Sequence, residues 1–422
     1  MSVHTKKYLS QDKKDLLSNF FSLTFLQGFN YLLPFLTLPY LVNILGVEKY
    51  GLVIFAQSFI IFFNIIVDFG FNLSATREIS IHREDREKIS EIYSSVMLIK
   101  LFLTLASFFV LLFFVFTIDK FNSEILLYLI SFLMVIGQAL FPIWYFQGHE
   151  KMKYITFINI LSKLIFTIAI FLFVKEKTDY LLVPLFNGIG VLIGSLYAIY
   201  IIKKDFNQKI ILQELKTIRH YFNQSSQFFL SRVSVSIYTA ANSFVLGIFT
   251  NNTMVGYYSV AEKMYLAIQS PYTPLTQVLY PYISKNKNIH FFKKVFFITV
   301  ILNIALMILI YFSSGFIFNL LFDSSITKES LQVFNFFLIA NLVVVPSILI
   351  GYPFLAALGF SKYVNMSVIF GSVFHLSVLL ILKFINKVSL YNIAILVIIT
   401  EALVFFLRMY WVKNKKLWKK LS

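Results

Sequence analysis

The sequence contains no cysteine and none of the short motifs that carry common catalytic chemistry. Without a thiol, the chain can form neither a disulfide nor a thiolate metal site. It also lacks the G-x-x-x-x-G-K-[ST] phosphate loop, the H-E-x-x-H zinc motif and the G-x-S-x-G nucleophile turn. ATP hydrolysis and the common hydrolase reactions therefore lack the residues to carry them. We expect no enzyme activity, no cofactor and no metal, and any transport must be driven by a gradient.

Charged residues are scarce as well. They make up 14% of the 422 residues, against 58% hydrophobic residues, and the mean hydropathy is +0.77. A soluble domain carries roughly a quarter charged residues. Segments 101–116 and 296–311 have no ionised side chain, and a bilayer core about 30 Å thick requires helices of about 20 mostly apolar residues. The composition predicts an all-α polytopic membrane protein, with loops too short for a soluble catalytic domain.

Apolar runs separated by turn residues predict about twelve transmembrane helices. The first run is too long for a cleavable signal peptide and has no small-residue cleavage site, so we expect it to be retained. The predicted spans cover residues 18–45, 51–72, 90–118, 124–146, 154–174, 180–202, 226–249, 255–283, 293–320, 330–358, 364–385 and 390–412.

The net charge of +17 comes from basic residues scattered over short loops, which argues against a nucleic acid partner. Their distribution follows the positive-inside rule instead. If both termini are cytoplasmic, most Lys and Arg residues lie in inside segments, including six from Arg408 to Lys420. The outside loops then hold only Lys49, Lys120, Lys175, Lys177, Lys328, Lys383 and Lys387. This alternation favours an even number of spans with both ends in the cytoplasm.

The longest polar connection, 203–224, follows the sixth span and divides the chain into lobes 1–208 and 209–422. A shift of 205 residues lays the first half on the second. It pairs Leu41 with Leu246, Gly51 with Gly256 and Ala56 with Ala261, and polar residues with polar residues elsewhere. Because six is even, both halves enter the membrane in the same direction. We expect two six-helix lobes related by a pseudo-two-fold axis along the membrane normal, around a central cavity.

Seven ionisable side chains lie well within the predicted spans, where each costs at least about 2.5 kcal/mol if it faces lipid. They are Asp68, Lys100, Lys163, Arg232, Glu262, Lys263 and Glu401. We expect them to face protein or a wet cavity. Helical spacing supports this, because Arg232, Ser236 and Thr239 share one helix face. Asn64 and Asp68 belong to a polar stripe in the second span.

Structural roles are open for several of these residues. Lys263 lies near the outer third of its helix and can extend its charge to the interface. Asp68 and Glu401 can serve only to pair with a buried cation. Lys100, by contrast, lies about 15 Å along its span by helical rise, which is too deep to reach water easily. We therefore favour a cavity role for Lys100, and similarly for Arg232 and Lys163.

Two segments resemble a known family. Residues 68–78 read Asp-Phe-Gly-Phe-Asn-Leu-Ser-Ala-Thr-Arg-Glu, which is similar to the D-x-G-x(6)-R signature of bacterial polysaccharide repeat-unit flippases of the Wzx type. Ala241-Asn242-Ser243 and the segment Val-Gly-Tyr-Tyr-Ser-Val-Ala-Glu-Lys at 255–263 also resemble this family. Its members belong to the multidrug, oligosaccharidyl-lipid and polysaccharide exporter superfamily. The resemblance covers the full length of the chain.

The resemblance implies a flippase of the bacterial cytoplasmic (inner) membrane. Such a protein moves oligosaccharide repeat units linked to undecaprenyl diphosphate from the cytoplasmic to the periplasmic leaflet by alternating access, for O antigen or a related surface polysaccharide. Membrane lipids and a glycan polymerase of the same pathway would be further partners. We expect Arg232, Lys100, Lys163, Lys263, Ser236, Thr239, Asn242 and Asn64 to bind substrate. Asp68, Glu262 and Glu401 would couple ion movement, and Arg77 would act at a cytoplasmic gate.

Two other functions remain open. A multidrug or metabolite antiporter of the same superfamily should favour acidic cavity residues for organic cations, whereas four of the seven buried ionisable residues here are basic. A membrane-embedded glycosyltransferase or polymerase would need a sizeable outer loop with catalytic residues. The predicted outer loops, such as 251–254, are too short for that.

Overall fold

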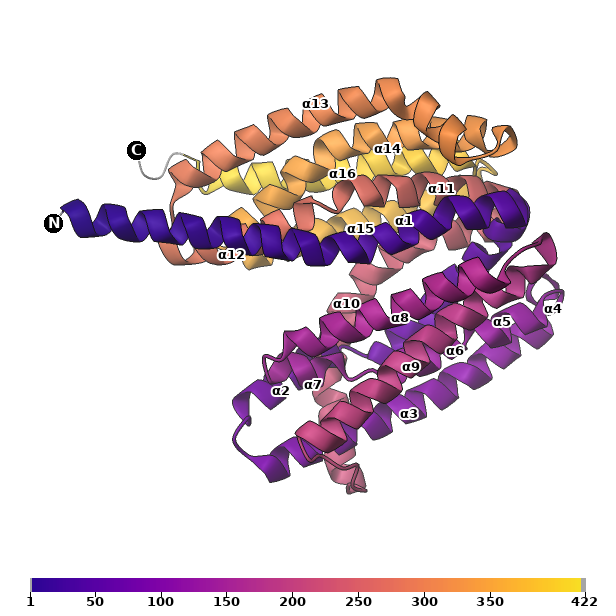
Figure 1. Cartoon of the computed structure of the whole chain (residues 1–422), viewed down its shortest axis with the longest axis horizontal. Coiled ribbons are helices and arrows are strands. Elements are labelled where there is room, and N and C mark those ends of the chain that lie inside the picture. The colour runs from indigo at the N-terminus through magenta and orange to yellow at the C-terminus, as the bar shows by residue number, and fades with distance from the viewer. Residues whose placement is uncertain (1, 419–422) are drawn as a thin grey trace. The chain divides into compact units, whose positions relative to one another are not determined.

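The structure is a computed structural model that describes the backbone of residues 2–418 (Figure 1). The side chains of residues 1–27, 29–31, 228, 230–240 and 325 lie outside the described part. Within 2–418 the chain forms helices and no β-strand. It divides into two compact units, which we call the N-terminal unit (Leu36–Gly256) and the C-terminal unit (Met1–Phe35 with Tyr257–Ser422).

The N-terminal unit begins within α1 (Ser2–Asp68), which breaks at Gly46, where the backbone has φ 74°. A positive φ is easily adopted only by glycine, so Gly46 separates the first two predicted spans. The following elements are α2 (Phe71–Ile81), α3 (Arg86–Thr117), α4 (Asp119–Asn122), α5 (Ile125–Ser131), α6 (Leu133–Leu140), α7 (Ile143–Gly148), α8 (Met152–Phe173), the 3₁₀ helix η1 (Lys177–Leu181), α9 (Leu182–Asp205) and α10 (Leu215–Phe249).

The C-terminal unit contains most of α11 and all later helices. A turn at Pro271 separates α11 from α12. Helix α14 continues into η2, a π-helical turn that contains Pro353. The elements are α11 (Asn252–Gln269), α12 (Tyr272–Asn286), α13 (Ile289–Leu321), α14 (Ser324–Ile350), η2 (Gly351–Ala356), α15 (Ser361–Phe384) and α16 (Leu390–Asn414).

Each of the twelve predicted spans coincides with an observed helix or with consecutive helices. Span 124–146 is divided into α5, α6 and α7, because Phe141 and Pro142 leave the helical conformation. Among the described residues, nine stretches are long and apolar enough to cross a membrane, and the longest, Leu32–Ile81, includes parts of two predicted spans. The all-α polytopic fold is confirmed. The boundary between lobes at residue 208 stays a prediction.

Phenylalanines fill the interior of the N-terminal unit and also cover its surface. Phe59 of α1 stacks on Phe121 of α4 and on Phe244 of α10, with ring centroids 4.8 and 5.5 Å apart. Phe102 and Phe109 of α3 are each 67% exposed. A large exposed aromatic side chain is favourable in hydrocarbon, so these two residues mark a lipid-facing side of α3.

Two backbone contacts in the N-terminal unit are reciprocal. A Cβ atom on Gly51 would lie 1.8 Å from the carbonyl oxygen of Asn252, and a Cβ atom on Gly256 would lie 2.3 Å from that of Val47. The shift of 205 residues pairs Gly51 with Gly256 and Val47 with Asn252. The contact of Gly51 with Asn252 is therefore equivalent to the contact of Gly256 with Val47, as in a two-fold symmetric pair. This supports the internal repeat read from the sequence.

Candidate functional site

The most deeply buried candidate is Lys100, in the middle of α3. Its side chain is 3% exposed, and its ammonium group donates a hydrogen bond to the backbone carbonyl of Gln138 in α6 at 3.2 Å. This is the only hydrogen bond of the group among the described residues, although an ammonium has three donors. Asp68, at the end of α1, lies within electrostatic reach. Lys100 is thus a buried cation whose ammonium group has two N–H donors without a partner among the described residues.

Further polar side chains of α1, α2 and α3 lie in the same unit as Lys100. Asp68 accepts a hydrogen bond from the Asn72 amide at 2.5 Å. Asn64 is half-buried, and its side-chain oxygen is buried with no hydrogen-bond partner among the described residues. On α3, Thr104 donates to the carbonyl of Lys100 at 2.7 Å, so its hydroxyl is used within the helix. Asn64 and Lys100 therefore keep unused polar capacity inside the unit.

The other predicted binding residues fall into different environments. Lys163 of α8 is half-buried, and Asn242 of α10 is 5% exposed. Lys263 of α11 is exposed, and so is Arg77 of α2, the predicted gate residue. The side chains of Arg232, Ser236 and Thr239 lie outside the described part of the chain. The sequence therefore placed Lys100 correctly in a buried environment, whereas the functional roles of all these residues stay predictions.

The predicted ion-coupling residues of the C-terminal unit lie around Tyr265. Glu262 and Glu401 are both half-buried, and both lie within electrostatic reach of Tyr265. From Tyr265 a chain of amides continues into the bundle. Gln269 donates to the hydroxyl of Tyr265 at 2.5 Å and to the side-chain oxygen of Asn341 at 3.3 Å.

The amide chain ends on two fully buried asparagines. Asn341 of α14 donates to the side-chain oxygen of Asn303 in α13 at 3.0 Å, and Tyr272 of α12 donates to the same oxygen at 2.7 Å. Both asparagines are 0% exposed. A buried amide without a partner is costly, so each one fixes the position of the other. Sequence patterns do not predict this network, because each asparagine is a single polar residue in an apolar run.

Arg408 corrects the sequence-based reading of the last span. The sequence analysis counted it with the inside segment 408–420, but it lies within α16 and is 7% exposed. Its guanidinium donates to the carbonyl and hydroxyl oxygens of Ser347 at 2.8 and 3.0 Å and to the Ser367 hydroxyl at 3.1 Å. A Cβ atom on Gly351 would lie 3.0 Å from it.

Arg408 thus ties three helices together where α14 changes into η2. Ser347 belongs to α14, Ser367 to α15 and Arg408 to α16. The Ser347 carbonyl also accepts the backbone N–H of Gly351, the first residue of η2, so the guanidinium adds a second donor to this carbonyl. The three hydrogen bonds indicate a structural role for this cation.

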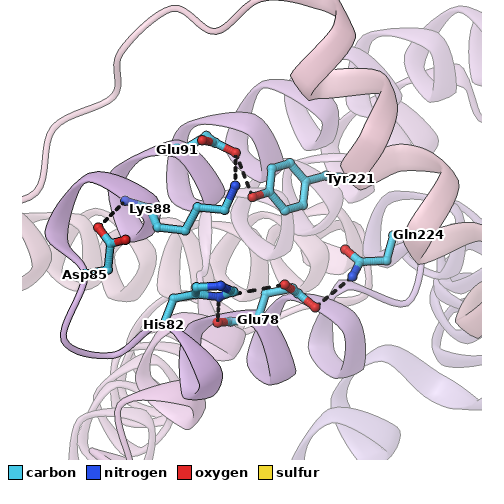
Figure 2. A network of polar contacts seen from close by, with 7 residues as sticks. All are labelled: Glu78, His82, Asp85, Lys88, Glu91, Tyr221 and Gln224. Atoms are coloured by element: carbon cyan, nitrogen blue, oxygen red, sulfur yellow. Dashed lines mark hydrogen bonds and ion pairs between the residues drawn. The ribbon is translucent and has the colours of Figure 1, made fainter.

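A polar network connects the start of α10 to α2 and α3 (Figure 2). Glu91 of α3 accepts hydrogen bonds from Lys88 at 2.6 Å and from Tyr221 at 2.9 Å, and Glu78 of α2 accepts one from Gln224 at 2.7 Å. Burial and the hydrogen bond to Glu91 raise the pKa of Tyr221. Because Tyr221 and Gln224 lie at the end of the longest polar connection, 203–224, the network anchors this connection to α2 and α3.

The fold defines the class of protein. The structure is similar to "Lipid II flippase MurJ, inward closed conformation", with a TM-score of 0.73, 16% identity and coverage of 96% of this chain and 89% of that one. It is also similar to an inward-facing multidrug resistance MATE family transporter of the MOP superfamily. There the TM-score is 0.72 and the identity 14%, with 94% of this chain and 96% of the other covered. The chain has the fold of this superfamily.

The family is more specific. Residues 16–287 match the family described as polysaccharide biosynthesis protein, and the chain belongs to it. Two relatives carry the name "Putative O-antigen transporter". The one from Escherichia coli (strain K12) is 28% identical over 421 residues, covering 97% of this chain and 99% of the relative. The one from Shigella dysenteriae is 33% identical over 270 residues, covering 63% and 67%. The resemblance read from the sequence is confirmed, and the chain is a transporter rather than an enzyme.

Proposed function

We propose that this protein is a flippase for polysaccharide repeat units linked to undecaprenyl diphosphate. It moves them from the cytoplasmic to the periplasmic leaflet of the bacterial inner membrane by alternating access, for O antigen or a related surface glycan. The family and the fold support the class. The names of the two relatives support an O-antigen substrate.

The buried Lys100 carries the proposal for the substrate. A diphosphate brings about two negative charges that must leave water, and charge-assisted hydrogen bonds to Lys and Arg in a poorly screened interior can offset that loss. Among the described residues, the Lys100 ammonium group donates one hydrogen bond, to a neutral carbonyl, which leaves donors for phosphate oxygens. Asn64 and Asn242 can bind sugar hydroxyls. Lys163 and Arg232 would contribute further positive charge.

The direction follows from charge and topology. With both termini in the cytoplasm, as the lysine distribution predicts, the membrane potential is negative on the side where the substrate enters. Outward movement of one negative charge is favoured by about 2.3 kcal/mol per 100 mV, or about 4.6 kcal/mol for two charges. Coupling to protons or another cation through Asp68, Glu262 and Glu401 would add to this driving force.

The ion-coupling role has its own test. The triple variant Asp68→Asn/Glu262→Gln/Glu401→Gln should abolish the pH dependence of translocation in reconstituted vesicles. An unchanged pH dependence would show that these carboxylates do not couple proton movement. Loss of all translocation would be resolved by the single variants, since only the coupling residue should alter the pH profile.

The function is tested by replacing Lys100 with methionine, which keeps the length of the side chain and removes its charge. In a strain that depends on this protein for its surface glycan, Lys100→Met should strongly reduce glycan display while the protein still reaches the membrane. The matched control is Lys362→Met, because Lys362 is exposed at the start of α15. Full display by Lys100→Met would contradict the proposed role of Lys100, and normal display after deletion of the whole protein would contradict the function.

A further inference from the structure

A cavity of about 540 Å³ lies at the C-terminal end of α16. It is lined by Met409, Val412, Lys413, Lys416 and Trp418. The walls are thus apolar, and two ammonium groups stand beside them, both on exposed residues. Since α16 is long and apolar enough to span the membrane, this end of the helix lies at a membrane surface.

Aromatic packing holds the indole at this cavity in place. Trp418 lies against Phe296 and Phe354, with ring centroids 5.6 Å apart in each pair. The ammonium group of Lys293 lies 5.7 Å from the indole centroid. A third positive charge therefore stands beside the cavity. Among the described residues, none of the three lysines has a carboxylate within salt-bridge distance.

At this end of α16 an exposed lysine, Lys416, has a left-handed backbone conformation. The amide of Lys416 donates to the carbonyl of Lys413 and the amide of Leu417 to that of Val412, both at 3.0 Å. These two bonds form a Schellman motif, whose left-handed position is usually occupied by glycine. Here Lys416 occupies it with φ 53°. Strained residues of this kind persist at binding sites more often than elsewhere.

We propose that this cavity binds the headgroup of an anionic phospholipid. Lys413, Lys416 and Lys293 would contact the phosphate, while Met409, Val412 and Trp418 would pack on the glycerol and the first acyl carbons. Lysine stems and a tryptophan ring suit this position, because their apolar parts lie in hydrocarbon and their polar ends in water. Basic pockets beside membrane helices bind anionic headgroups in this way. The proposal does not depend on the direction of transport or on the glycan.

The test compares two variants that lose the same charge at the same end of the protein. The pocket variant is Lys413→Ala/Lys416→Ala. The control variant is Lys415→Ala/Lys362→Ala, because Lys415 faces the ring of Tyr363 instead, at 5.6 Å, and Lys362 is exposed on α15. Native mass spectrometry of the purified full chain, titrated with phosphatidylglycerol, measures the bound lipid. We expect affinity about tenfold weaker or more in the pocket variant, and unchanged affinity in the control.

Equal loss in both variants would overturn the proposal, because it would indicate only diffuse surface charge. Equal binding of phosphatidylcholine and phosphatidylglycerol would also overturn it, since the cavity would then accept any acyl chain. Displacement of the lipid by millimolar inorganic phosphate would point to a free phosphate site instead. None of these outcomes tests the proposed function, because the binding assay contains no lipid-linked oligosaccharide.

A spectroscopic measurement locates the lipid in the cavity. Brominated phosphatidylglycerol should quench the fluorescence of Trp418, and the quenching should fall in Trp418→Phe and in the pocket variant. The two other tryptophans are Trp144, which is 0% exposed, and Trp411, which stacks on Tyr363 at 4.2 Å. Quenching that is unchanged in Trp418→Phe would place the lipid elsewhere and contradict the proposal.

Discussion

The two halves of the chain are alike at one contact and opposite in how they treat a buried cation. Gly51 and Gly256 make the same backbone contact with exchanged partners. In the part of the chain that the structure describes, Lys100 in the first half has one hydrogen bond, whereas Arg408 in the second has three, all to groups of α14 and α15. The comparison teaches that the two halves can share one close backbone contact and still differ inside, where one buried cation keeps hydrogen-bond donors and the other uses them on neighbouring helices.

The glycine pair should give the largest effect. In Gly51→Ala and in Gly256→Ala the new methyl group would meet a backbone carbonyl that no rotamer change can move. Each variant should lose about 3 kcal/mol or more of stability, with similar losses for the two, measured as the shift in thermal unfolding of the detergent-solubilised protein. The control is Gly315→Ala, whose methyl group would meet no atom within 4 Å. Clearly unequal losses in the pair would break the symmetry argument.

Arg408→Met should give the next largest effect. It removes the three hydrogen bonds to Ser347 and Ser367 at the end of α14, which should cost about 2 kcal/mol. The exposed Arg86→Met is the matched control, because it removes the same group at the surface. Thermal unfolding equal to that of the control would show that the three hydrogen bonds contribute no net stability.

The amide network should behave as a coupled unit of intermediate strength. Asn341→Leu removes the side-chain hydrogen bonds that Asn341 makes with Asn303 and Gln269 and should cost about 1 to 2 kcal/mol. The double variant Asn303→Leu/Asn341→Leu should cost less than the sum of the single variants, since both amides are then absent. Strict additivity in this double-mutant cycle would contradict the coupling inferred from the distances.

Lys100→Met should change stability least. Removal of a desolvated charge with a single hydrogen bond relieves a penalty, so the thermal unfolding should stay within about 1 kcal/mol of the wild type or rise. This result would sharpen the contrast with Arg408. A loss as large as that of Arg408→Met would mean that Lys100 is a structural cation too.

The sequence predicted the helices well because apolar runs and turn residues are local signals. It also predicted the burial of Lys100, since a lysine in the middle of a long span cannot reach water. It could not predict which group accepts a hydrogen bond from that lysine, because the acceptor is the backbone carbonyl of Gln138, 38 residues away on another helix. Arg408 was misplaced for a related reason. A basic residue near the end of a span looks like an interfacial residue until its partners on α14 and α15 are known.

The repeat shows the same division between local and non-local information. The identities at Gly51 and Gly256 were visible in the sequence. Their meaning came only from the contacts with Val47 and Asn252, which the same shift relates. Partners of single polar residues, such as Asn303 and Asn341, leave no periodic pattern and can be found only in the fold.

The most direct test of the account measures translocation itself. Purified protein would be reconstituted into liposomes that contain a fluorescent oligosaccharide linked to a prenyl diphosphate, and a membrane-impermeant quencher would report its movement between leaflets. We predict that Lys100→Met lowers the rate at least tenfold while its thermal unfolding matches the wild type. Translocation by Lys100→Met at the wild-type rate would contradict the claim that this buried cation receives the diphosphate.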